Sequence, residues 1–206
     1  MRKHYKQSES ILEEAIELVG VGDRRGARRL LEPFVESRGP GYAQAVIPLA
    51  LLMERAGEME SAARLYRIGM DSGDSIEGPQ AAINLGCLLR DDLGDLGGAR
   101  EAFEQAARSG HRDITPAAIN NLAAVARLQG NANETELQYR QVVASEHPDY
   151  APVAMLNLAG VLEHDGDIEG AREWYKAALA TGHQFVASDA RSGLVRLDSP
   201  YAEEVR

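Results

Sequence analysis

The chain has 206 residues, of which 44% are hydrophobic and 26% are charged, and its formal net charge is -10. This composition is typical of a globular protein that buries a core, while the net acidity argues against a general nucleic-acid or anionic-membrane binder, since both need a basic face. The single cysteine, Cys87, excludes an internal disulfide framework and suits a reducing compartment.

The N-terminal segment, residues 1–7, has no apolar stretch after its charges, so we expect no secretory signal. The longest apolar run, residues 45–53, contains a proline and is too short to cross a membrane. Only three of the 22 basic residues are lysines, a bias that indicates a GC-rich, bacterial coding sequence. We therefore expect a cytoplasmic bacterial protein.

A period of about 36 residues runs along the chain. It is most visible in residues 94–111 and 166–183, which share the pattern GD-x-x-GARE and end in Gly-His. A glycine followed by a polar residue opens each repeat of the pattern, at Gly22, Gly57, Gly94, Gly130 and Gly166. Glycine suits the left-handed end of one helix, and Asp or Asn caps the next. Each pair thus predicts a tight turn between two helices, looser at Glu58 because glutamate caps poorly.

A small residue stands five positions after each glycine, and a large one follows four positions later. The pairs are Ala27 and Leu31, Ala62 and Tyr66, Ala99 and Phe103, Thr135 and Tyr139, and Ala171 and Tyr175. This spacing places both members on one apolar stripe of a helix. Each unit is accordingly helix, short turn, helix, longer turn.

Three irregularities interrupt the pattern. The stretch RDDLGD, residues 90–95, carries one extra residue, which we expect to lengthen the turn without disturbing either helix. Pro33 and Pro48 fall inside predicted helices, where each removes a hydrogen bond and should kink its helix or shift its start.

The predicted organisation is all-α. An N-terminal segment spans residues 1–7, a capping helix spans 184–198, and a tail spans 199–206. Between them lie five repeats, at about 8–39, 40–75, 76–112, 113–148 and 149–183. The capping helix has no partner helix after it, so we expect it to cover the exposed apolar face of the last repeat.

The combination of Asn-Leu-Gly or Asn-Leu-Ala (residues 84–86, 121–123 and 157–159), Gly-Asp, alanine and an aromatic ring resembles the tetratricopeptide repeat. The endings of the second helices, such as residues 174–183, also resemble the related Sel-one-like repeat. The resemblance covers about residues 8–197. It implies a right-handed α-solenoid whose first helices line a concave groove that binds a peptide or another protein.

Counting back from each turn glycine places Asn84, Asn121 and Asn157 on the groove face. The resemblance implies that such asparagines contact a ligand backbone, since an amide offers both a donor and an acceptor; alternatively they bind neighbouring groups of the protein itself. Further predicted groove residues are Arg55, Arg90, Asn120, Arg127 and His164. The arginines favour a ligand with a carboxylate.

Catalytic and metal sites find no support in the sequence. His111, His147 and His183 recur once per repeat, about 10 Å apart, which is too far for shared metal ligands, so we assign them to the ends of helices. Cys87 lies inside a predicted helix and is interpreted as a packed residue. We predict no enzyme activity, no cofactor and no metal.

Two functions are compatible with these observations. The first is a non-catalytic adaptor that binds a peptide or partner segment in its groove. The alternative is a homo-oligomeric scaffold assembled through its edges or its capping helix, with the tail, residues 199–206, as a candidate filler of a neighbouring groove.

Overall fold

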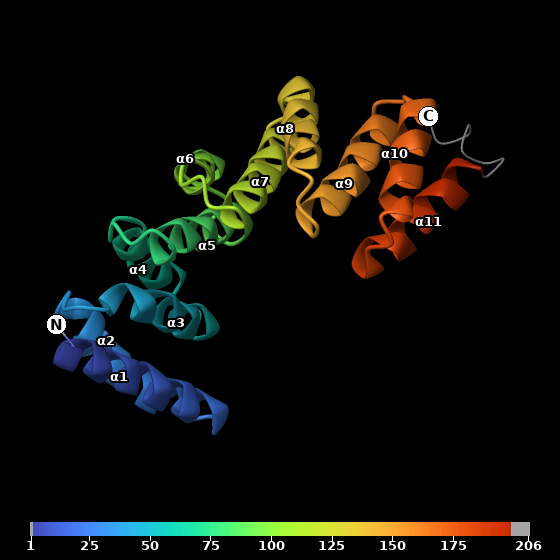
Figure 1. The fold of residues 1–206 in the computed structure, drawn as a ribbon. Helices are drawn as coiled ribbons and strands as arrows, with labels where there is room; N and C mark the ends of the chain where they lie inside the picture. The colour runs from blue at the N-terminus through green and yellow to red at the C-terminus, as the bar shows by residue number, and fades with distance from the viewer. Residues whose placement is uncertain (1, 199–206) are drawn as a thin grey trace. The chain divides into compact units, whose positions relative to one another are not determined.

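A computed structural model of the chain describes residues 2–198, with side chains from residue 9 onward. Over this range the chain forms helices joined by turns, and no strand (Figure 1). The helices are α1 (Arg2–Gly20), α2 (Arg24–Glu36), α3 (Tyr42–Arg55), α4 (Met59–Met70), α5 (Glu77–Asp91), α6 (Leu96–Ala107), α7 (Ile114–Leu128), α8 (Ala132–Ala144), α9 (Tyr150–His164), α10 (Ile168–Ala180) and α11 (Gln184–Leu197).

The helices form two compact units. Unit 1 ends at Ile114 and holds α1–α6, and unit 2 begins at Thr115, one residue into α7. In unit 1 each helix packs on the next, and α3 also packs on α1 and α5. In unit 2, α9 packs on α8, α10 and α11. Within the described part of the chain, no helix is long and apolar enough to span a membrane.

The five predicted turn glycines all end a helix in the left-handed region. Their φ angles run from 67° at Gly94 to 85° at Gly22, which a side chain would strain. In four of the turns the N–H after the glycine donates to the carbonyl five residues back, as in Asp167 N–H to Leu162 O at 2.9 Å. The turn before Glu58 has the same backbone bond at 2.9 Å, so its backbone is no looser than the others, but Glu58 makes no side-chain cap bond, as its poor capping ability predicted.

Three of the five turns also carry a side-chain cap. The carboxylates of Asp23, Asp95 and Asp167 each accept the N–H of a glycine three residues on, at 2.8–3.0 Å. A Cβ on that glycine would lie 2.3–2.5 Å from the second oxygen of the capping carboxylate, Oδ2, so the glycine leaves room for the cap. Asn131 was predicted to cap α8, but its side chain makes no cap bond. The third residue after it is a glutamate rather than a glycine.

The extra residue in the third turn is absorbed as predicted. Asp95 N–H donates to Leu89 O at 2.8 Å, six residues back, while Leu93 N–H bonds Leu88 O. Both flanking helices, α5 and α6, remain intact. Neither proline breaks its helix: α2 runs through Pro33, and α3 runs through Pro48. Since α2 starts two residues after its turn glycine, as α6 and α10 do, Pro33 does not shift its start.

Two of the three periodic histidines, His111 and His147, act at the beginnings of helices rather than at their ends, whereas the side chain of His183 makes no cap bond. His111 Nδ1 accepts the N–H groups of Asp113 and Ile114 at 3.2 and 3.4 Å, and so caps α7. His147 Nδ1 accepts the equivalent pair before α9 at 3.2 and 3.3 Å. These bonds satisfy N–H groups that a helix start leaves without partners. The assignment of these two rings to the preceding helix ends was therefore wrong.

The predicted small–large pairs form the core of each unit. All ten side chains, from Ala27 to Tyr175, are at most 3% exposed. Close approach is visible at two glycines: a Cβ on Gly86 would lie 2.5 Å from the Phe103 ring, and one on Gly193 would lie 2.5 Å from the Tyr175 ring. The helix α11 covers α9 and α10 with Val186 and Ala190, which are 1% and 0% exposed. The division into five repeats at the stated bounds stays a prediction.

Candidate functional site

The predicted groove residues fall in both units. Arg55, Asn84 and Arg90 belong to unit 1, while Asn120, Asn121, Arg127, Asn157 and His164 belong to unit 2. Among these, Arg127, Asn157 and His164 line one groove of about 640 Å³, which we call the unit 2 groove. Its full lining is Arg127, Gly130, Ala132, Thr135, Tyr139, Leu156, Asn157, Gly160, Val161, His164 and Asp165.

The unit 2 groove is shaped by the ends of α7 and α9 and the start of α8. Arg127 stands in the last turn of α7, and His164 ends α9. Gly160 adds no side chain, and a Cβ there would meet only the Tyr175 hydroxyl, at 3.9 Å. The sequence did not single out Gly160 or the aliphatic Leu156 and Val161 as lining residues. Their positions on the same helix as Asn157 were the available signal.

Two side chains in this groove have no partner among the described residues. Arg127 and His164 are both exposed, and neither makes a hydrogen bond or ion pair there. Asp165 is the one acid in the lining. A guanidinium and an imidazole, flanked by Leu156 and Val161, can receive an acidic group of a ligand together with an apolar neighbour.

The asparagines already bond to the protein in different ways. Asn157 Nδ2 donates to Asn120 Oδ1 at 3.4 Å, which leaves the Asn157 oxygen available. Asn121 Nδ2 donates to Ala117 O at 3.0 Å within its own helix. In unit 1, Gln80 Nε2 lies 3.5 Å from Asn84 Oδ1. Of the three periodic asparagines, Asn157 is the one that lines the unit 2 groove.

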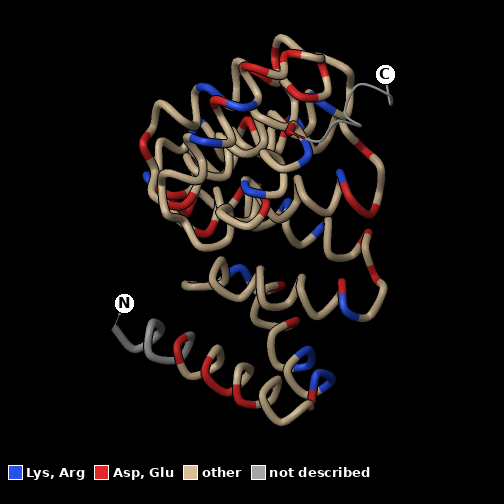
Figure 2. The backbone as a smooth tube through the Cα atoms, turned by 90° about the vertical axis from the view of Figure 1, so that its right-hand side faces the viewer, with Lys and Arg blue, Asp and Glu red and all other residues tan. Residues whose placement is uncertain are grey.

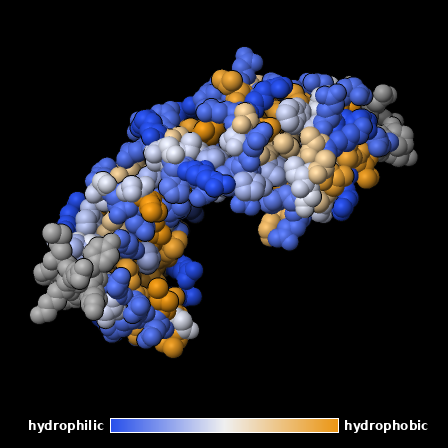
Figure 3. All heavy atoms as spheres, viewed as in Figure 1, coloured by the Kyte–Doolittle hydropathy of each residue, from blue (hydrophilic) through white to orange (hydrophobic). Residues whose placement is uncertain are grey.

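The arginines of unit 1 differ from Arg127. Arg90 forms a two-pronged pair with Asp91, at 2.7 and 2.8 Å, and lies 5.8 Å above the Phe103 ring. Arg55 borders an apolar groove of about 230 Å³, lined by Leu12, Ala15, Ile16, Val19, Leu31, Pro48, Leu51 and Leu52. Figure 3 shows apolar side chains over this α1–α3 region, and Figure 2 shows acidic positions along α1.

Tyr175 of α10 contacts two charged side chains at the C-terminal end of unit 2. Tyr175 Oη donates to Glu163 Oε2 at 2.7 Å, and the Arg196 guanidinium bonds both Glu163 oxygens at 2.6 and 2.7 Å. Arg196 also reaches Tyr175 Oη at 3.1 Å. Burial, assisted by the bond to Glu163, raises the pKa of Tyr175 to about 12. The hydrogen bond from Arg196 lowers the pKa of Glu163. We call these three residues the Tyr175 triad.

The described side chains, from residue 9 to residue 198, assemble no candidate metal site. No group of three or more metal-ligating side chains comes together among them. Burial raises the pKa of the Cys87 thiol, which keeps the thiol protonated and a poor nucleophile.

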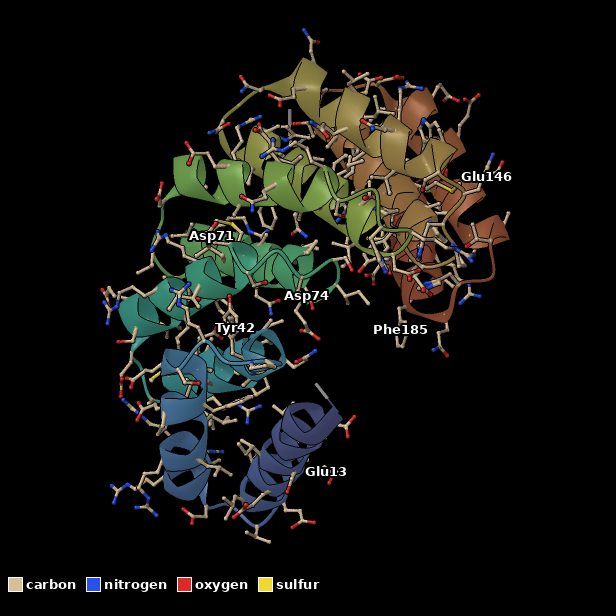
Figure 4. All side chains as sticks on the ribbon, turned by 60° about the vertical axis from the view of Figure 1, so that its left-hand side comes forward. Glu13, Tyr42, Asp71, Asp74, Glu146 and Phe185 are labelled. Atoms are coloured by element: carbon tan, nitrogen blue, oxygen red, sulfur yellow. The ribbon has the colours of Figure 1, made fainter. Side chains whose placement is uncertain are left out.

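Two labelled residues illustrate other features of the helix starts (Figure 4). Phe185, which is 76% exposed, extends from the start of α11. Asp74 caps α5 by accepting the N–H groups of Ile76 and Glu77.

Comparisons with known proteins agree on one architecture. The family model of the tetratricopeptide repeat matches residues 12–75 and 136–184. Pseudomonas aeruginosa pilF is similar at a TM-score of 0.71 and 16% identity, with 98% of each chain covered. BtubC (BKLC) from P. vanneervenii is similar at 0.69 and 18%, covering 84% of this chain and 78% of that one.

A MamA protein is similar at a TM-score of 0.67 and 16% identity, over 84% of this chain and 91% of that one. No curated protein sequence matches the chain. At such identities the structural similarities concern the fold alone. They confirm the predicted all-α solenoid class.

Proposed function

Since the chain belongs to the tetratricopeptide repeat family, whose members are generally non-catalytic modules for binding other proteins, we propose that its unit 2 groove captures a partner segment bearing a carboxylate. The observation that carries this proposal is that Arg127 and His164, which have no partner among the described residues, lie in one groove with Asn157. The partner's carboxylate bonds Arg127, and its backbone bonds the Asn157 oxygen.

The energies favour a short segment rather than a single group. A charge-assisted bond to Arg127 contributes about 1.5–3 kcal/mol, and a neutral bond to Asn157 about 1 kcal/mol. Micromolar binding needs about 8 kcal/mol. The remainder comes from apolar area against Leu156 and Val161, at about 25 cal/mol per Å². A carboxylate with an adjacent apolar side chain is therefore the ligand pattern that fits this groove.

A pull-down tests the proposal. Wild-type protein should retain a partner that the Arg127→Gln, His164→Gln double variant loses. Arg191→Gln is the matched control, since Arg191 is an exposed arginine of unit 2 that does not line the groove. Retention of the same partner by the double variant would contradict binding in the unit 2 groove.

A defined probe makes the test independent of any lysate. Acetyl-Val-Glu-Gly-amide should shift the backbone amide signals around Arg127 and His164 in a nitrogen-15 NMR titration. The glutamine analogue should bind at least tenfold more weakly, because it lacks the charge. Equal shifts by both peptides would contradict recognition of a carboxylate.

Self-assembly is a second candidate, favoured by the apolar groove of unit 1. Ile16, beside that groove, is 67% exposed, and Leu51 is 39% exposed. Light scattering should show an oligomer that Ile16→Lys dissociates, while Val195→Lys, at another exposed apolar position, leaves it intact. A monomeric wild-type chain would end this alternative. The suggested filler, residues 199–206, lies outside the described residues.

A further inference from the structure

The spacing of the Tyr175 triad occurs a second time in the chain. Glu163 precedes Tyr175 by 12 residues, and Arg196 follows it by 21. Around Tyr66, the residue 12 positions earlier is Glu54 and the residue 21 positions later is Cys87. The helices correspond as well, because α3, α4 and α5 supply the first set as α9, α10 and α11 supply the second.

The two places differ at the residue that carries the positive charge. In the Tyr175 triad Arg196 bonds the glutamate and the tyrosine together. At Tyr66 a cysteine occupies that position, and within the described residues the hydroxyl of Tyr66 makes no hydrogen bond of normal geometry. Tyr66 is 0% exposed, so this orphaned group is also shielded from bulk water. A buried polar group without a hydrogen bond lowers the stability of the folded protein by about 1–3 kcal/mol.

A small cavity of about 150 Å³ lies beside Cys87, the residue at the position equivalent to Arg196. We call it the Tyr66 notch; its lining is Leu51, Glu54, Tyr66, Asn84, Cys87, Leu88, Asp91 and Asp92. Of its three acids, Asp91 is paired with Arg90, which does not line the notch. Glu54 lies near the Tyr66 hydroxyl and helps to raise the pKa of that phenol, but neither Glu54 nor Asp92 forms an ion pair within the described residues. The notch is thus an acidic cavity with a buried hydroxyl at its wall.

We propose that the Tyr66 notch binds the guanidinium group of an arginine from a protein partner. The chain itself displays the geometry, since Arg196 presents its Nε and one terminal nitrogen to Glu163 and the same nitrogen to Tyr175. An incoming guanidinium repeats the contact with Glu54, and it reaches the buried Tyr66 hydroxyl when the side chains that cover this hydroxyl move aside. It neutralises the unpaired acid and satisfies the orphaned hydroxyl, which the Cys87 thiol does not do.

This proposal rests on the proposed function only in taking the arginine from a protein. The notch belongs to unit 1 and the carboxylate groove to unit 2, and each has its own probe. A positive arginine titration with a negative glutamate titration retains the notch and rejects the groove, and the reverse result rejects the notch alone.

The first experiment is an NMR titration with acetyl-Gly-Arg-Gly-amide. We expect shifts at the amides of Asn84 and Cys87, no binding of the citrulline analogue, and at least fivefold weaker binding of the lysine analogue, which lacks the planar fork. Glu54→Gln should weaken binding at least tenfold, and Tyr66→Phe at least threefold. Equal binding of the arginine and citrulline peptides would overturn the proposal.

The second experiment exchanges the residues at the equivalent positions. Cys87→Arg should fill the notch with the chain's own guanidinium, raise the Tm and abolish binding of the arginine peptide. Arg196→Cys should lower the Tm and create a second site for that peptide beside Tyr175. Undiminished binding to folded Cys87→Arg protein would overturn the proposal. So would an oligomer of the wild-type chain that Cys87→Arg dissociates, because another copy would then be the occupant.

Discussion

The surroundings of Tyr66 and Tyr175 differ although the two rings occupy equivalent positions in the same scaffold. Both rings are buried, and both have a glutamate 12 residues earlier. Arg196 closes the site around Tyr175, whereas Cys87 leaves the Tyr66 hydroxyl without a partner and a cavity beside it. The difference indicates that one residue of the following helix decides whether the tyrosine hydroxyl is bonded by an arginine of the chain or stands beside a cavity.

Removing either tyrosine ring should destabilise the protein more than any other change considered below, and by the same amount at both positions. Tyr66→Ala and Tyr175→Ala each delete an aromatic side chain that is at most 3% exposed, which costs about 3–5 kcal/mol of unfolding free energy. Urea unfolding followed by circular dichroism measures both. A loss at Tyr66 of less than half that at Tyr175 would mean that the two rings are not equivalently packed.

Close packing against the ring is expected to matter only at Tyr175. In Gly193→Ala the new Cβ would lie 2.5–2.7 Å from three ring carbons, costing about 1–3 kcal/mol and outweighing the gain of about 1 kcal/mol in helix propensity. At the equivalent position beside Tyr66 stands Asn84, which already carries a side chain. Gly160→Ala, with its nearest atom 3.9 Å away, is the control and should stabilise the protein.

Removing the hydroxyl alone should affect the two sites with opposite signs. Tyr175→Phe deletes a hydroxyl bonded to Glu163 and Arg196 and should cost about 1 kcal/mol. Tyr66→Phe deletes a buried group without a partner and should be neutral or stabilise by up to about 1 kcal/mol. Thermal and urea unfolding of the two variants, in the absence of ligand, gives both signs. Equal destabilisation would show that the Tyr66 hydroxyl is satisfied in solution.

The smallest effect is the pH dependence of the Tyr175 triad. Because Arg196 lowers the pKa of folded Glu163, their pairing stabilises the protein fully above the ordinary glutamate pKa of about 4.3. This contribution is lost as the pH falls through the lowered value. Arg196→Gln should therefore cost under about 1 kcal/mol at pH 7, since Arg196 is more than half exposed, and less at pH 3. In a Glu163→Gln background the cost should not change with pH.

The repeating framework was predictable because its determinants are local. Each turn depends on a glycine and its neighbours, and each core pair on two residues four apart, so periodicity located all of them. The Asp caps were also foreseen, but the glycine three residues after each one was not. Gly26 and Gly98 acquire their role only from the space that the carboxylate needs.

The side-chain chemistry of the candidate sites was less predictable. The sequence placed Arg127, Asn157 and His164 on one face, and they do line one groove. It gave no sign that Asp91 would engage Arg90, since neighbours in sequence face apart unless their side chains bend together. The state of the Tyr66 hydroxyl depends on residues from three helices, and helical periodicity alone does not determine whether their polar atoms meet.

The longer third turn offers a place to modify the protein. Residues 91–95 are exposed, and both helices that flank this turn tolerate one more residue than the other turns contain. Such a loop is thermodynamically the least costly location for added sequence. An epitope or fluorophore-acceptor peptide grafted between Asp92 and Leu93 would label the chain in living cells at the rim of the Tyr66 notch, which Asp92 lines.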